Sequence, residues 1–169
     1  IGFGIASKFA KNGATLVING LASDSEVKKL SSELKLLGAA EVLFDSADLS
    51  KPVEIDRMFK NIIQKYQRVD VLVNNAGIQF VSPIENFPPE KWEMIIRIDL
   101  IAAFYTIKNV IPIMKQQKWG RVINIASAHA LVASPFKSAY VAAKHGLIGL
   151  TKSVALEVAQ DGITVNSIC

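Results

Sequence analysis

Five short runs of mostly apolar residues recur along the chain, and the segments between them mix apolar and polar positions. A run of this length without strict alternation is typical of a strand that helices cover on both faces. We therefore predict five strands of a parallel sheet, at residues 15–19, 41–45, 71–74, 121–126 and 164–168.

The segments between these runs carry helical patterns. The clearest places apolar side chains at spacings of three and four, on one face of a helix, at Ile55, Met58, Phe59, Ile62, Ile63 and Tyr66. Ser50 is the candidate N-cap of that helix, and Pro52 is tolerated in its first turn. Further helices are expected at residues 25–37, 97–118 and 138–160. An irregular stretch before Trp92 is indicated by Pro83, Pro88 and Pro89.

Strand and helix thus alternate along the whole chain, which predicts an α/β fold. The expected architecture is a doubly wound parallel sheet, a Rossmann-type three-layer sandwich with right-handed crossovers. A length of 169 residues with 50% apolar content suits one domain spanning residues 1–169.

Composition and charge limit the classes of partner that the chain is expected to bind. The formal charge is +4, with 19 basic and 15 acidic residues interspersed, so no basic tract indicates nucleic-acid binding. No apolar run reaches the ~18 residues that a membrane span requires. The lone Cys169 excludes an intrachain disulfide and a cysteine-rich zinc site. We expect no nucleic-acid partner, no membrane partner and no metal centre.

The most informative local pattern is a tyrosine four residues before a lysine, Tyr140 and Lys144. On a helix these side chains share one face, and the ammonium group favours the phenolate form of the tyrosine. A phenolate is a base. Ser127 follows the predicted strand 121–126, at the sheet edge where open α/β folds bind ligands.

A turn of small residues follows another predicted strand. Asn75, Ala76 and Gly77 come directly after residues 71–74. A backbone with so little side-chain bulk can approach a flat cofactor closely. Gly2 stands at the start of the first predicted helix, where unpaired N–H groups and the helix dipole favour a pyrophosphate.

Together these motifs, in this order and spacing, resemble the short-chain dehydrogenase/reductase family over the whole chain. The resemblance implies that Tyr140 is the general base, that Lys144 tunes it and holds the nicotinamide ribose, and that Ser127 holds the reacting oxygen. The opening residues resemble the tail of the family's phosphate-binding loop. We therefore expect a fragment that lacks the family's first strand, substrate lid and last strand.

The same resemblance assigns the remaining cofactor residues. Asp48 and Leu49 match the family position beside the adenine ring; the alternative for Asp48 is a turn or cap residue. After the strand 15–19 there is no carboxylate until Asp24 and no arginine for a 2′-phosphate, so the residues leave NAD versus NADP open. Resemblance to one group within the family, described next, favours NAD.

Three polar residues narrow the substrate. Gln79, His129 and Lys137 stand at offsets that resemble bacterial D-3-hydroxybutyrate dehydrogenases, in which these positions bind the substrate carboxylate. The implied reaction is the reversible oxidation of (R)-3-hydroxybutyrate to acetoacetate by NAD in ketone body metabolism. Alternatives are another reductase of the family, acting on a 3-oxoacyl thioester or a sugar alcohol, and a non-catalytic nucleotide-binding scaffold.

One position departs from the family pattern. The family's fourth catalytic residue is an asparagine that supports a local helix distortion and a proton relay, and the corresponding residue here is Asp99. Aspartate has nearly the same shape but lacks the amide donor, which bears on the relay and on turnover. Relatives are usually tetramers that pack the helices 97–118 and 138–160, so a cytoplasmic homotetramer is expected.

Overall fold

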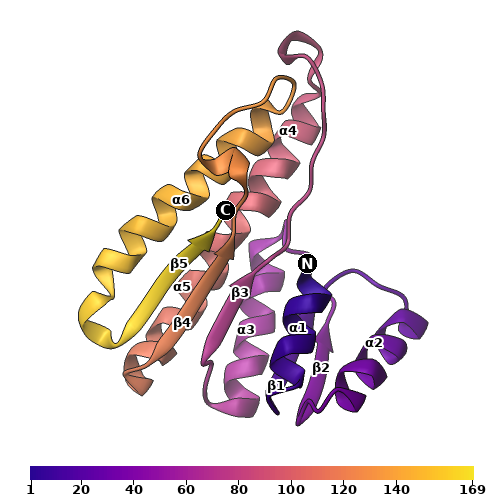
Figure 1. The fold of residues 1–169 in the computed structure, drawn as a ribbon, viewed down its shortest axis with the longest axis vertical. Coiled ribbons are helices and arrows are strands. Elements are labelled where there is room, and N and C mark those ends of the chain that lie inside the picture. Colours follow the sequence, from indigo (N-terminus) through magenta and orange to yellow (C-terminus); the bar gives the residue numbers. More distant parts are fainter.

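The computed structural model describes residues 1–169 as five parallel strands that alternate with helices (Figure 1). All five predicted strands are confirmed, with ends that differ by no more than one residue. Their bounds are β1 (Thr15–Asn19), β2 (Glu41–Asp45), β3 (Val71–Asn74), β4 (Gly120–Ile125) and β5 (Ile163–Ile168).

Six helices separate or flank the strands. They are α1 (Gly2–Ala10), α2 (Asp24–Leu36), α3 (Pro52–Tyr66), α4 (Pro89–Ile96), α5 (Ala102–Gln117) and α6 (Ser138–Glu157). The helix predicted to start at residue 97 starts earlier, because Pro89 occupies the first turn of α4, where a missing N–H costs nothing. A π-helical turn, Arg97–Ile101, then leads directly into α5.

The N-cap prediction for α3 was wrong. Lys51 holds that position, directly before Pro52, and makes no side-chain cap. The Ser50 hydroxyl instead donates to Asp48 Oδ1 at 2.7 Å. Pro52 fixes where the helix begins, so Ser50 falls one residue too early to cap it.

The strands form two parallel sheets. One pairs β1 with β2, and the other has the order β3-β4-β5; no ladder joins β1 to β3. Along the chain, successive strands are added toward opposite outer edges in the two sheets. Right-handed crossovers therefore place α2 on one face and α5 and α6 on the other. The doubly wound arrangement is therefore confirmed, as a sheet interrupted in its middle.

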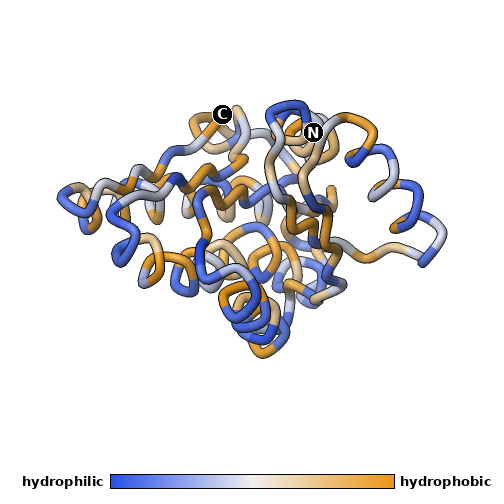
Figure 2. The backbone as a smooth tube through the Cα atoms, turned by 90° about the horizontal axis from the view of Figure 1, so that it is seen from below, coloured by the Kyte–Doolittle hydropathy of each residue, from blue (hydrophilic) through white to orange (hydrophobic).

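The main core lies between α3, α5 and the sheet β3-β4-β5. It buries the predicted stripe of α3, including Ile55 and Phe59, against Val110 and Met114 of α5. Each such side chain contributes about 1.5–3 kcal/mol when it is fully buried. Figure 2 shows that hydrophobic residues gather along the strands and that hydrophilic residues lie in the turns outside. None of the helices combines the length and the apolar character that crossing a bilayer would demand.

A buried polar chain crosses this core and was not predicted. Asn124, fully buried in β4, accepts from Asn74 Nδ2 of β3 at 2.8 Å and donates to Thr151 Oγ1 of α6 at 2.8 Å. Thr106 of α5 donates to Asn74 Oδ1, and Ser167 of β5 contacts Thr151, both at 2.7 Å. These bonds fix α5 and α6 relative to the strand ends.

Candidate active site

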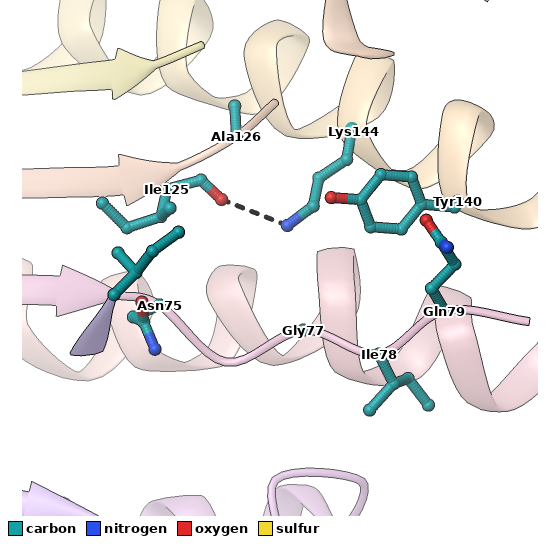
Figure 3. Close-up of a pocket in the computed structure, with 9 residues that line it drawn as sticks. Asn75, Gly77, Ile78, Gln79, Ile125, Ala126, Tyr140 and Lys144 are labelled. Carbon is teal, nitrogen blue, oxygen red and sulfur yellow. Dashed lines mark hydrogen bonds between the residues drawn. The ribbon is translucent and has the colours of Figure 1, made fainter. Parts of the chain in front are cut away.

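A pocket of about 360 Å³ opens where β3 and β4 end (Figure 3). The ends of adjacent parallel strands with their following turns are the usual ligand site of an open α/β sheet. Residues from β4, α6, the turn after β3 and the start of the chain line it: Ile1, Asn75, Gly77, Ile78, Gln79, Ile125, Ala126, Tyr140 and Lys144.

Tyr140 and Lys144 reach this pocket from one face of α6, as predicted (Figure 3). Lys144 Nζ lies 5.5 Å from the centroid of the Tyr140 ring. The lysine is 3% exposed, and its ammonium group donates to the carbonyl of Ile125 at 3.1 Å. A buried ammonium group acts more strongly on a neighbouring phenol than an exposed one does, because little water screens the charge.

Ser127 and His129 lie beside the pocket. The N–H of His129 donates to Ser127 Oγ at 3.1 Å, and His129 Nδ1 is 3.4 Å from the same oxygen. The His129 ring meets the Tyr140 ring edge-on, with centroids 6.0 Å apart. His129 Nε2 is 2.8 Å from Ser134 Oγ. Ser134 was missed by sequence reasoning, because nothing in its spacing separates it from an ordinary loop serine.

The small-residue turn lies against the first helix. A methyl group added to Gly2 would stand 2.8 Å from Asn75 Nδ2, so the start of α1 and the turn approach each other closely. Asn75, Gly77 and Gln79 line the pocket, while Ala76 is exposed beside them. The turn, the start of α1 and the catalytic pair therefore surround the same space.

Asp99 is buried behind the pocket, within the π-helical turn. Its Oδ1 accepts the N–H of Ile78 at 2.8 Å, and its Oδ2 lies 3.4 Å from Lys144 Nζ. Burial raises the pKa of the Asp99 carboxyl above its ordinary value, although the Ile78 N–H and the charge of Lys144 oppose the shift. The helix distortion expected at this residue is present.

Eight predicted site residues lie outside the pocket lining, among them Lys137, Asp48 and Leu49. Lys137 stands immediately before α6, partly buried, next to the N-terminal end of the catalytic helix. The Asp48 carboxylate accepts from the Ser50 N–H at 2.9 Å and pairs with Lys51 at 3.3 Å, which is the turn role considered for it. Leu49 packs against the main core. Contacts of Asp48 and Leu49 with adenine stay predictions.

The chain's own groups fit a nicotinamide dinucleotide. The first turn of α1 begins at Gly2, and the N–H groups and dipole of a helix N-terminus favour an anion such as a pyrophosphate. Gly2 lets that helix end approach the turn at Asn75, and the pocket continues from there to Tyr140 and Lys144.

Several known proteins are similar to this chain in sequence. A family model described as short chain dehydrogenase matches residues 1–169. A D-beta-hydroxybutyrate dehydrogenase of Rhizobium meliloti is 54% identical over 169 residues, covering 100% of this chain and 66% of that protein. The Cupriavidus necator protein of the same name is 50% identical over 170 residues, covering 100% and 65%. A 3-oxoacyl-acyl-carrier-protein reductase of Synechocystis is 35% identical over 168 residues, covering 99% and 68%.

A solved structure shares the fold. A metagenomic short-chain oxidoreductase crystallised in complex with NADP superposes with a TM-score of 0.93 at 30% identity, over 98% of this chain and 75% of that one. The chain therefore spans about two thirds of the length of the curated relatives and three quarters of this structural neighbour.

Proposed function

Because this chain belongs to the short-chain dehydrogenase family, we propose that it catalyses the reversible oxidation of (R)-3-hydroxybutyrate to acetoacetate with NAD. The observation that carries the proposal is that Tyr140 and Lys144 line one pocket together with Gln79. A base, the charge that tunes it and a neutral hydrogen-bonding group then surround one small substrate.

In the proposed mechanism the chain moves a proton while hydride leaves the alcohol carbon. The nicotinamide ring, when bound, accepts that hydride. Tyr140 takes the hydroxyl proton, so the alcohol loses one hydride and one proton and becomes a ketone. Lys144 stabilises the phenolate, and Ser127, oriented by the His129 N–H, holds the reacting oxygen. In the reverse direction Tyr140 donates the proton.

Binding of the substrate carboxylate is assigned to Gln79, His129 and Lys137. A lysine and two neutral donors on one side of the reacting carbon suit a short hydroxy acid. Gln79 reaches toward the Tyr140 ring in the pocket (Figure 3). Two relatives named D-beta-hydroxybutyrate dehydrogenase are 54% and 50% identical, against 35% for the 3-oxoacyl-acyl-carrier-protein reductase, which supports the acid over a thioester.

NAD is proposed as the cofactor on the resemblance to D-3-hydroxybutyrate dehydrogenases, and the charges that follow β1 are compatible with it. The first charged residues after Asn19 are Asp24 and Glu26, both acidic, in the first turn of α2. Negative charge there disfavours the 2′-phosphate of NADP. The solved relative in complex with NADP makes this comparison worth measuring directly.

The experiment is a spectrophotometric assay of NADH formation by the complete protein with a panel of hydroxy acids. We expect (R)-3-hydroxybutyrate to be the best substrate and NAD to exceed NADP in kcat/KM. Faster reduction of a 3-oxoacyl thioester would favour that reductase activity instead. Cofactor binding without turnover of any alcohol would favour the nucleotide-binding scaffold.

We also propose a cytoplasmic homotetramer, by resemblance to the family. Apolar side chains exposed on the helices concerned support an interface there: Ile101 and Leu156 are 40% and 81% exposed, and Phe104 is 45% exposed. Size-exclusion chromatography with light scattering measures the assembly directly.

A further inference from the structure

One oxygen of the Asp99 carboxylate has a hydrogen-bond partner, and the other has none. Its side chain is fully buried, and Oδ1 accepts the Ile78 N–H at 2.8 Å. Oδ2 faces Lys144 Nζ at 3.4 Å and has no hydrogen-bond partner. Burial without a hydrogen-bond partner disfavours the ionised form of a carboxylate, whereas the nearby ammonium group favours it.

The surrounding packing leaves this carboxylate little freedom. A methyl group on Gly77 would stand 2.9 Å from Asp99 Oδ2 and 3.4 Å from Lys144 Nζ. The cofactor-side turn, the carboxylate and the ammonium group are therefore packed as one unit. A change in the charge of Asp99 therefore acts on both neighbours at short range.

Lys144 consequently acts on two acidic groups. Its ammonium group is 3.4 Å from Asp99 Oδ2 and 5.5 Å from the Tyr140 ring centroid. An ionised Asp99 offsets much of the positive field at Tyr140, whereas a protonated Asp99 leaves that field undivided. Among the other titratable groups on neighbouring elements, His129 lies edge-on to Tyr140 and Lys137 stands at the start of α6. The remaining ones are exposed: Glu90, Lys91 and Glu93 of α4, Arg97 of the π-helical turn and His145 of α6. The turn after β3 and the end of β4 contribute no charged residue to the pocket.

We propose that Asp99 is a positioning residue that serves as counter-ion to Lys144, and that the proton on its Oδ2 sets the pH at which Tyr140 works as a base. The inference rests on the proposed role of Tyr140. Through Ile78 the same carboxylate anchors the turn that leads to Gln79. The departure from asparagine therefore makes the site proton-sensitive without removing its anchor.

The decisive comparison is Asp99→Asn against the wild type in the complete protein. Asparagine keeps an oxygen for the Ile78 N–H and removes the charge. We expect the midpoint of the pH profile of hydroxy-acid oxidation to move to lower pH by at least about half a unit. Asp99→Ala should show the same shift and also a raised KM, because it loses the hydrogen bond to the Ile78 N–H.

Asp161→Asn, which breaks a surface pair with Lys115 at the opposite end of the strands, is the matched control and should not move the midpoint of the pH profile. An unchanged midpoint in Asp99→Asn overturns the proposal.

A second readout needs neither cofactor nor turnover. The folded-state pKa of Asp99 is raised, so its contribution to stability is present below the ordinary aspartate pKa and is lost as pH rises through the folded value. The unfolding free energy of Asp99→Asn minus that of wild type should therefore increase with pH across that window. A difference that stays flat contradicts the inference.

If a variant fails to fold, carbon-13 NMR titration of the aspartate carboxyls in the unmodified protein still tests the inference. One buried carboxyl should titrate above the ordinary range, and its absence contradicts the inference. If no hydroxy acid is oxidised while these titrations behave as expected, the proposed function fails and the proton on Asp99 stands.

Discussion

Lys137 is the residue on which the proposed binding of the substrate carboxylate most depends. It was assigned by resemblance to the substrate carboxylate, and it stands directly before the helix that carries Tyr140 and Lys144. We propose that its charge binds the substrate carboxylate and does not contact the cofactor. Resemblance assigned Lys137 and Tyr140 to the site, whereas the partner of His129, Ser134, is visible only once the loop is folded.

Replacing Lys137 with alanine should therefore separate substrate binding from cofactor binding. We expect KM for hydroxybutyrate to rise about 10- to 100-fold, since a hydrogen bond to a charged group contributes roughly 1.5–3 kcal/mol. Affinity for NAD, measured by NADH fluorescence or calorimetry, should be unchanged. Lys152→Ala, an exposed lysine farther along α6, is the control. Equal losses of substrate and cofactor affinity would remove Lys137 from the substrate site.

Among the elements, α6 is positioned by more than apolar contacts. Its Thr151 hydroxyl accepts from Asn124 and donates to the Leu147 carbonyl at 2.7 Å, which ties the helix to β4 below the active site. The strands were predictable because apolar runs carry their own signal. The polar chain was not, because Asn124 and Thr151 become partners only through tertiary packing. The early start of α4 was missed because proline reads as a breaker except in a helix's first turn.

Thr151→Val tests this tie. Valine keeps the shape and leaves the Asn124 amide without its buried acceptor, so we expect a loss of about 1–3 kcal/mol in the unfolding free energy. Thr164→Val, at an exposed position of β5, is the isosteric control and should change stability by less than about 0.5 kcal/mol. Urea denaturation measures both. Similar losses in the two variants would show that the polar chain is not what stabilises α6.

At the scale of the whole molecule, the two sheets depend on α3, which connects β2 to β3. Arg57 of α3 forms a two-pronged pair with Asp45 at the end of β2, with N–O distances of 2.9 and 2.7 Å. The hydrogen bonds from Arg57 lower the pKa of the Asp45 carboxyl, more than burial raises it. No strand ladder joins the two sheets within residues 1–169. They are linked through α3, which this pair ties to β2 and which packs against α5.

The Asp45 pair predicts a stability that depends on pH in the acid range. A lowered folded-state pKa contributes stability above the ordinary aspartate value, and that contribution is lost as pH falls through the folded value. Asp45→Asn should therefore lower the unfolding free energy by about 1–3 kcal/mol at pH 7 and by much less near pH 2. Asp56→Asn, an exposed carboxylate on α3, is the control. A deficit that stays equal at both pH values would contradict the assignment.

The account as a whole depends on proton transfer by Tyr140, and Tyr140→Phe in the complete protein tests it most directly. Phenylalanine preserves the ring that packs against His129 and removes only the hydroxyl. We predict that single-turnover hydride transfer from hydroxybutyrate falls by about 10²–10⁴-fold while NAD binding is retained. A variant that reduces NAD at close to the wild-type rate would contradict the central claim.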